Sequence, residues 1–251
     1  MIYANTRLFL LMMLNSALLT LSLERLMPKP DEYIILLYHH ISAKESPYSV
    51  SPTLFKKQIK FLKEEFDIVK LSDVKKDRGF QGKKVIITFD DGYQDIYTNA
   101  YKIIKEHNIP ITIFLISGRI GKKGYLNWNQ INELKKSGLV EFGNHSRNHR
   151  ALDKLNADEL KSEIAGADKD LRNKLGKIKY FSYPFGDRYD KRAVKLLKKL
   201  EYKYCLTWVT GINDKGTDPY QLKRISINGL DFKNKLKLRY ASIYFKVFKK
   251  K

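Results

Sequence analysis

Short apolar runs rich in β-branched and aromatic residues alternate with longer amphipathic segments along most of this chain. This alternation constrains the fold more than any other feature of the sequence. The short runs have the length and composition of strands buried on both faces. The longer segments have the spaced apolar residues of helices that cover one face of a sheet. Strands that alternate with helices of ten or more residues imply βα units, and so a parallel sheet or barrel.

About seven such units are present, which is close to the number that closes a barrel. The predicted strands are Tyr33 to Tyr38, Ile68 to Leu71, Val85 to Phe89, Ile111 to Ile116, Leu139 to Phe142, Tyr180 to Tyr183, Tyr204 to Val209 and Leu222 to Ile227. The predicted helices are Pro52 to Phe66, Ile96 to His107, Asn127 to Lys136, Asp158 to Leu175 and Lys191 to Leu200.

The length of 251 residues suits one domain, residues 31–230, with an addition at each end. Residues 1–30 form an apolar segment in which Leu8 to Leu23 carries no charge. This stretch is shorter than the roughly 20 residues that span a bilayer, so it is a signal anchor, an export signal or a helix lying on the domain. Residues 231–251 form a basic amphipathic tail, which suits either an anionic membrane surface or a helix packed on the domain.

The charge balance is strongly basic, with 48 Lys and Arg residues against 27 acidic residues and a net charge of +21. Such a balance predicts a polyanionic partner, and the two ends favour an anionic membrane surface. We exclude nucleic acid because the chain has no nucleic-acid-binding motif. We expect a membrane-associated protein of the cell envelope, with secretion or the cytoplasmic face of the inner membrane as alternatives. The single cysteine, Cys205, excludes an intrachain disulfide, and the oligomeric state is left open.

Polar residues follow three of the predicted strands directly. Asp90 and Asp91 come after Val85 to Phe89, His39 and His40 come after the first strand, and His145 and His149 follow Leu139 to Phe142. Active sites of parallel α/β folds assemble at these strand ends, and four of the five histidines lie there. The alternative for the aspartates is a turn and a helix cap.

Metal binding is the chemistry that these residue types predict. His145 and His149 are four residues apart, so both rings point to one side if Ser146 to His149 forms a helical turn. One aspartate added to them gives the nitrogen and oxygen ligands of a catalytic zinc site, with positions left for water and substrate. The other aspartate is then available as a base. The predicted reaction is metal-assisted hydrolysis of an acyl or phosphoryl bond.

Three motifs carry a family resemblance: T-F-D-D-G-Y at 88–93, H-S-R-N-H at 145–149 and F-S-Y-P-F-G at 181–186. In this order they resemble the motifs of the polysaccharide deacetylases, the NodB homology domain of carbohydrate esterase family 4. Y-P-F-G and the early L-L-Y-H-H resemble the branch that acts on poly-N-acetylglucosamine. The resemblance implies a distorted (β/α)7-type barrel, a divalent metal that is usually zinc, and removal of N-acetyl groups from an amino sugar. The implied substrate is a bacterial envelope or extracellular polysaccharide or its lipid-linked precursor.

Carried over by position, the resemblance implies that Asp90 is the general base and that Asp91, His145 and His149 hold the metal. His39 is the implied general acid. His40 is expected to be a neighbour that packs or forms a hydrogen bond.

Two departures from the family pattern concern the support of Asp90 and the acid. The arginine that usually braces the base is absent from the third motif, where Ser182 precedes Tyr183, so we expect Arg224 or Arg188 to replace it and favour Arg224. No histidine follows His149, so the late histidine that usually provides the general acid in this family is also absent. Residues expected at the substrate are Tyr183, Pro184, Phe185, Trp208 and Arg224, although a core position for Trp208 is an alternative.

Two other functions remain open at this point. One is a deformylase that acts on a lipid-linked amino sugar, which the basic and apolar ends favour. The other is a catalytically inactive glycan-binding protein, which the missing arginine and late histidine favour.

Overall fold

The computed structural model describes residues 32–44, 46–74, 84–186 and 190–227. The apolar segment 1–30, the basic tail 231–251 and Arg188 lie outside the described residues. Within the described ranges, no helix combines the length and the apolar character that crossing a membrane requires.

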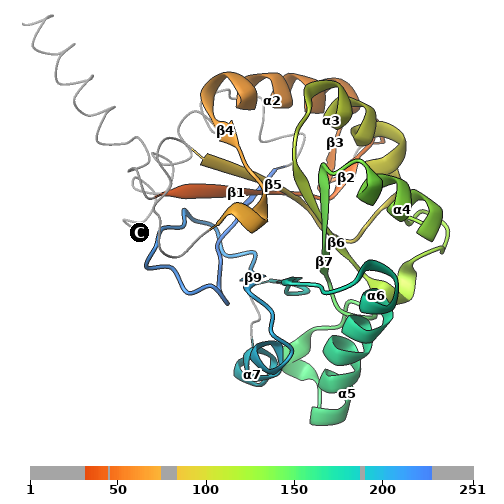
Figure 1. Ribbon diagram of the computed structural model, residues 1–251, viewed down its shortest axis with the longest axis vertical. Helices are drawn as coiled ribbons and strands as arrows, with labels where there is room; N and C mark the ends of the chain where they lie inside the picture. The colour runs from red at the N-terminus through yellow and green to blue at the C-terminus, as the bar shows by residue number, and fades with distance from the viewer. Residues whose placement is uncertain (1–31, 45, 75–83, 187–189, 228–251) are drawn as a thin grey trace, which may run out of the picture.

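A parallel sheet that curls into a barrel forms the centre of the molecule (Figure 1). In spatial order its strands are β10 (Ile225–Ser226), β1 (Tyr33–Tyr38), β5 (Lys84–Phe89), β6 (Ile111–Leu115), β7 (Val140–Asn144), β8 (Tyr180–Ser182) and β9 (Tyr204–Leu206). Leu206 in β9 also bridges Leu222, shortly before β10, so the two ends of the sheet come together. The predicted (β/α)7-type barrel is confirmed.

Two further pairings lie beside this barrel. β4 (Asp67–Ile68) pairs with the beginning of β5, and β2 (His40–Ile41) pairs with β3 (Ser49–Val50) in a separate short sheet. β2 begins two residues after the end of β1, so this short sheet starts at the C-terminal end of a barrel strand.

Alternation along the strands divides the apolar side chains into an outer and an inner core. In β1, Ile34 and Leu36 belong to the outer cluster that packs under the helices, whereas Tyr33 and Ile35 belong to the inner cluster. Phe114 and Leu206 contribute to the same inner cluster. The barrel interior is therefore filled by side chains, and a ligand site has to lie at an end of the barrel.

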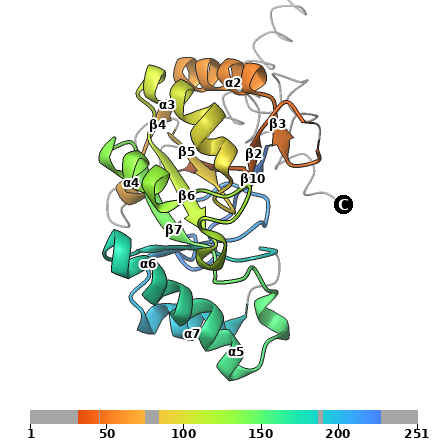
Figure 2. The same cartoon turned by 90° about the vertical axis from the view of Figure 1, so that its right-hand side faces the viewer.

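The helices follow one another round the outside of the sheet (Figures 1 and 2). Local capping explains where two of them begin: Ser51 Oγ accepts from Leu54 N, and the Asn127 side chain accepts from Gln130 N. The α-helices are α2 (Pro52–Glu65), α3 (Tyr101–His107), α4 (Trp128–Lys136), α5 (Ala157–Lys161), α6 (Ala167–Leu175) and α7 (Lys191–Lys199). Short 3₁₀ helices span Leu71–Asp73, Ser117–Arg119 and Leu152–Lys154.

Several predicted elements differ in detail from the structure. The predicted strand Ile68 to Leu71 is wrong, because the strand is Asp67–Ile68 and Leu71 begins a 3₁₀ helix. Two predicted α-helices contain π-helical turns, at Ile96–Ala100 and Ser162–Gly166. Such turns are often found at functional sites. The last two predicted strands are shorter than expected, since their outer residues make only isolated hydrogen bonds, such as Thr207 N to Leu222 O.

Candidate active site

The tip of β5 presents two aspartates in different directions. Asp90 follows Ile86 and Thr88 on the inner face of the strand and is 3% exposed. Asp91 and Gly92 then both adopt left-handed backbone conformations, each with φ 70°, which turns the chain sharply. A side chain at Gly92 would also meet Leu115 Cδ2 at 2.8 Å. The left-handed backbone favours glycine at this position, and the turn separates the directions of the two carboxylates.

The loop that carries His145 and His149 is not the helical turn that the spacing suggested. Ser146 and His149 have left-handed backbone angles, with φ 65° and 60°. Hydrogen bonds hold this shape: Asn144 Oδ1 accepts from Ser146 N at 2.8 Å, and Ser146 Oγ accepts from His149 N at 3.0 Å. The two rings still converge, with centroids 4.8 Å apart.

A buried carboxylate supports the middle of this loop. Glu163, 2% exposed in the π-helical turn Ser162–Gly166, accepts from Asn148 N at 2.8 Å and from Asn148 Nδ2 at 2.7 Å. From the other side, Asn144 Nδ2 donates to Tyr202 Oη at 2.8 Å. The positions of both histidines therefore depend on one residue from a helical segment and one from a later loop.

Asp91, His145 and His149 are arranged to share one cation. Asp91 Oδ1 lies 3.5 Å from His145 Nε2 and 3.6 Å from His149 Nε2, and one ligand atom from each residue falls within 4.8 Å of the others. In a tetrahedral site with bonds of about 2.0–2.2 Å, neighbouring ligand atoms are about 3.3–3.6 Å apart. The spacing and the donor types fit a divalent metal such as zinc.

The hydrogen bond of His145 and the pKa of His149 also suit metal binding. His145 Nδ1 donates to the Ser182 carbonyl at 2.8 Å, which leaves the Nε2 lone pair facing Asp91. Burial, together with the neighbouring His145, lowers the pKa of His149 to about 4, so its ring is neutral at pH 7. Neutral imidazoles and an ionised carboxylate are the ligand forms that a metal needs.

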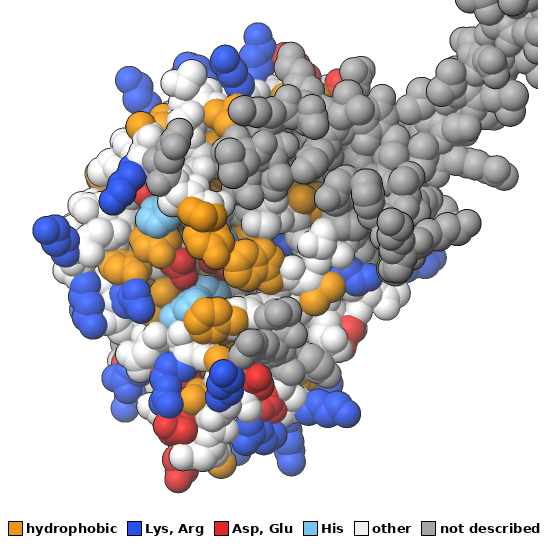
Figure 3. Space-filling model, turned by 180° about the vertical axis from the view of Figure 1, so that it is seen from behind, with side chains coloured by type: hydrophobic (Ala, Val, Ile, Leu, Met, Phe, Trp, Pro, Cys, Tyr) orange, Lys and Arg blue, Asp and Glu red, His pale blue; other side chains and the backbone are white. Residues whose placement is uncertain are grey.

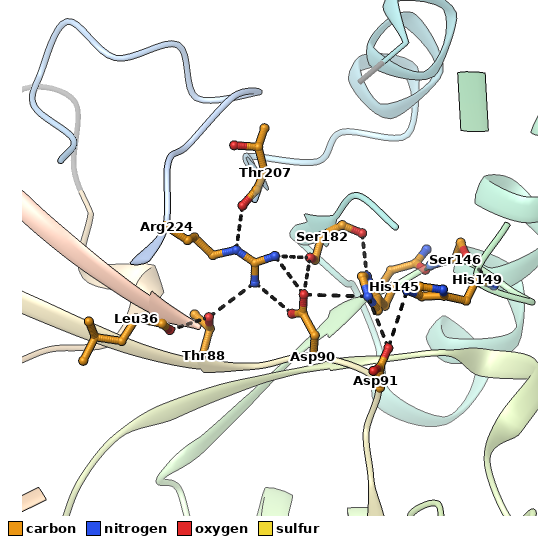
Figure 4. A network of polar contacts seen from close by, with 11 residues as sticks. Leu36, Thr88, Asp90, Asp91, His145, Ser146, His149, Ser182, Thr207 and Arg224 are labelled. Carbon is orange, nitrogen blue, oxygen red and sulfur yellow. Dashed lines mark hydrogen bonds and ion pairs between the residues drawn. The ribbon is translucent and has the colours of Figure 1, made fainter. Parts of the chain in front are cut away.

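Arg224 forms a buried two-pronged ion pair with Asp90 (Figure 4). Its Nη1 and Nη2 donate to Oδ1 and Oδ2, each at 2.8 Å, and the arginine is 1% exposed. Ser182 Oγ lies between them, donating to Asp90 at 3.0 Å and accepting from Arg224 Nη2 at 2.8 Å. The expectation that Arg224 braces Asp90 is confirmed.

This ion pair sets the protonation state of Asp90. Burial by itself would raise the pKa of the carboxyl group, but the Arg224 guanidinium and the nearby His145 outweigh it and hold the pKa well below its usual range. Asp90 is therefore a carboxylate at any ordinary pH, and its Oδ2 lies 3.7 Å from His145 Nε2.

The two adjacent histidines after β1 have different surroundings. His39 lines the cavity above Asp90 and Asp91, and burial lowers its pKa while those two carboxylates act in the opposite direction. His40 Nδ1 contacts Asp95 Oδ2 at 2.6 Å, and its ring stacks on Tyr93 with centroids 3.6 Å apart. The expectation for His40, a packing and hydrogen-bonding neighbour, is confirmed.

The remaining predicted residues lie around the same cavity, with one exception. Tyr183, Phe185 and Trp208 line it together with the metal ligands. The exception is Pro184, which is buried and is not among the described residues that line the cavity. Arg224 reaches the cavity from below, through its contact with Asp90.

This arrangement matches a known family. The family model described as polysaccharide deacetylase matches residues 77–205, just over half of the chain and including the aspartate pair and both histidines. The chain belongs to the polysaccharide deacetylase family. Members of this family are hydrolases, so this chain is an enzyme of that class and the cavity is its candidate active site.

Individual relatives are similar to this polysaccharide deacetylase over most of its length. The poly-β-1,6-N-acetyl-D-glucosamine N-deacetylase of Staphylococcus aureus (strain MRSA252) is 33% identical over 221 residues, which cover 80% of this chain and 76% of the relative. The structure of Streptococcus pyogenes deacetylase PplD in complex with acetate is 28% identical, with a TM-score of 0.73, and covers 80% of this chain and 94% of PplD. IcaB from Ammonifex degensii, 23% identical, shares the fold with a TM-score of 0.73 over 87% of this chain and 98% of IcaB.

Three contributors to the deacetylase site were not assigned from the sequence. Ser182 stands inside a quoted motif, and its position before Tyr183 was the available signal. Glu163 lies in a helix whose pattern gave no sign that its carboxylate turns inward. Tyr48 lines the cavity from the segment between β2 and β3, where nothing in the sequence marked it.

Proposed function

We propose that this deacetylase removes N-acetyl groups from an N-acetylated amino-sugar polymer of the bacterial envelope, of the poly-β-1,6-N-acetylglucosamine type. One observation carries the proposal: Asp91, His145 and His149 converge at 3.5–3.6 Å beside a second carboxylate, Asp90, that Arg224 keeps ionised. The name of the Staphylococcus aureus relative supports the type of sugar. The acetate in the PplD complex supports an acetyl group rather than a formyl group.

Asp91, His145 and His149 would hold the divalent metal, and zinc is the metal we favour because two imidazoles and one carboxylate are its usual catalytic ligands. When bound, such an ion polarises the acetamide carbonyl and makes a nearby water more acidic.

The chain's own residues move the protons. Asp90 accepts the proton of the water that attacks the acetamide carbon, and Arg224 and Ser182 hold its carboxylate in place for that transfer. His39, on the opposite wall, gives a proton to the sugar nitrogen as the carbon–nitrogen bond breaks, so acetate and an amine leave.

The proposed function predicts acetate release that depends on metal. Purified protein is incubated with oligomers of β-1,6-linked N-acetylglucosamine and with matched N-formyl oligomers, and acetate and formate are measured. We expect acetate release to dominate, to stop when a chelator removes the metal, and to return when Zn²⁺ is added. Faster formate release would favour the deformylase. Glycan binding without release by fully metal-loaded protein would favour the inactive binding protein.

The same proposal locates the deacetylase domain, residues 31–230, at a membrane surface of the cell envelope. The net charge of +21 and the uncharged stretch Leu8 to Leu23 support this location, with secretion or the cytoplasmic face of the inner membrane as alternatives. Full-length protein should sediment with vesicles that contain anionic lipid and much less with neutral vesicles. Failure to sediment with either vesicle type would contradict a membrane location.

A further inference from the structure

Large exposed apolar side chains gather at one place on the described surface. Those with high exposure are Tyr48, Phe185 and Val209, at 48%, 45% and 46%. Tyr48 and Phe185 line the active-site cavity, and Val209 follows Trp208, which also lines it. Figure 3 shows hydrophobic side chains surrounding the histidine and aspartate side chains on this face. Exposed apolar surface of this kind, next to a polar cavity, is typical of a ligand-binding edge.

Hydrogen bonds hold the backbone of Tyr48 in this position. Tyr48 lies immediately before β3, and its carbonyl accepts from His40 N at 3.2 Å. Its own N–H donates to Ser46 Oγ at 3.2 Å, and Ser46 Oγ is 2.8 Å from Ser49 Oγ. Both sides of the residue are thus tied to the β2–β3 pair, although half of the side chain is exposed.

The Tyr48 ring lies next to His39, the proposed acid, and is more exposed to solvent. Its centroid is 5.3 Å from that of His39 and 6.1 Å from that of Trp208, and the His39 and Trp208 centroids are 5.7 Å apart. The three rings form a triangle with interplanar angles of 45–55°. The inner corner, His39, belongs to the catalytic cavity, and Tyr48 and Trp208 extend it outwards.

Phe185 closes the other side of the cavity with a strained backbone. Its φ is 54°, a left-handed value that is unfavourable for an aromatic residue, and its ring packs against His149 with centroids 4.7 Å apart. The next residue, Gly186, accepts from Trp208 N at 3.0 Å. A side chain at Gly186 would approach Trp208 N to 2.2 Å, so the two walls meet there in close contact. Strain that displays an exposed ring at an active site indicates a binding role.

We propose that Tyr48 and Trp208 form a stacking platform for the sugar unit that adjoins the one being deacetylated. The proposal rests on the proposed function and adds that Tyr48 is a specificity-determining residue. The reacting sugar places its acetamide over Asp91, His145 and His149, and its neighbour lies across Tyr48 and Trp208.

The chemistry of a pyranose fits these rings. One face of the sugar carries mainly C–H groups, which pack on an aromatic face, and the hydroxyl groups around its edge stay in water. A single sugar bound over the carboxylates would leave Tyr48 exposed. A second sugar linked to it reaches the platform and buries that ring. The enzyme therefore gains affinity from the second unit and favours an oligomer over a monosaccharide.

The test compares substrate lengths in metal-loaded, full-length protein. We measure kcat/KM for acetate release from β-1,6-linked N-acetylglucosamine oligomers of one to five units. For Tyr48→Ala, we expect the loss of kcat/KM on the trimer to exceed the loss on the monomer by about 3- to 12-fold, mostly through KM. Tyr48→Phe keeps the ring and should restore the length preference. Asp153→Asn changes an exposed residue outside the cavity and should leave the length preference intact.

The outcomes separate this inference from the proposed function. Acetate release from every oligomer with no change of length preference in Tyr48→Ala overturns the platform alone. Equal losses on monomer and trimer also overturn it, since they indicate that Tyr48 acts only through His39. A loss of vesicle binding in Tyr48→Ala, with the length preference retained, would assign the ring to a membrane surface instead. No acetate release from any oligomer by the wild-type protein contradicts the proposed function itself.

Discussion

Asp90→Asn lowers kcat for deacetylation by about 100- to 10,000-fold, the range expected when a general base is removed. Asn keeps the shape of the side chain but cannot take a proton from water. Asp91, His145 and His149 are unchanged, so the variant should bind Zn²⁺ with nearly the wild-type affinity. Steady-state rates of acetate release, combined with metal analysis of the same samples, measure both quantities.

Two companion variants make this result specific. Asp91→Asn should lose metal as well as activity, because it weakens a direct ligand. Asp153→Asn changes an exposed aspartate and should behave as wild type. Retention of most of the wild-type rate in Asp90→Asn would show that another group is the base. Loss of metal in Asp90→Asn would show that Asp90 acts as a ligand.

Arg224→Met destabilises the fold by about 3–5 kcal/mol at pH 7, because it leaves the charge of Asp90 buried and unpaired. The side chains of Arg224 and Asp90 are only 1% and 4% exposed, so water screens this pair very little. Denaturant unfolding of wild type and variant, monitored at equilibrium, gives the free energy of unfolding of each. The double variant Asp90→Asn, Arg224→Met removes both charges and should recover much of the loss.

The pH dependence of this loss follows from the pKa of Asp90. In the wild-type protein its folded-state pKa lies below its unfolded-state value, so the ion pair adds stability above about pH 4 that disappears only as the pH falls through the depressed folded-state pKa. Without Arg224, burial raises the pKa, and the folded variant disfavours the ionised carboxylate. The difference in unfolding free energy should therefore shrink between pH 7 and pH 4. A difference independent of pH would mean that Arg224 stabilises the fold through packing alone.

Elements whose signals are local were predictable from the sequence. β1 and β5 lie within one residue of the predicted strands, because continuous β-branched and aromatic runs are buried on both faces in a parallel barrel. The helices α2 and α4 begin where expected, since Ser51 and Asn127 satisfy the free N–H groups of the first turn. The two π-helical turns were not predicted, because no residue type marks them in the way that Ser51 and Asn127 mark the helix starts.

The histidine motif shows how a correct site can follow from an incorrect local structure. The spacing of His145 and His149 suggested a helical turn, yet left-handed residues held by Asn144 and Glu163 bring the rings together. Local hydrogen bonds and a contact with the more distant Glu163 together stabilise that backbone.

The sequence by itself determined the alternating strands and helices, the family motifs, and the identity of the residues that converge at the strand ends. These follow from side-chain chemistry and short-range spacing. The sequence only suggested that Arg224 pairs with Asp90, and the tertiary structure established this pair. The tertiary structure alone showed that Ser182 lies between them and that Tyr48 stands beside Trp208. Arg224 is 134 residues from Asp90, and such pairs meet only when the barrel closes, which depends on the packing of all its strands together.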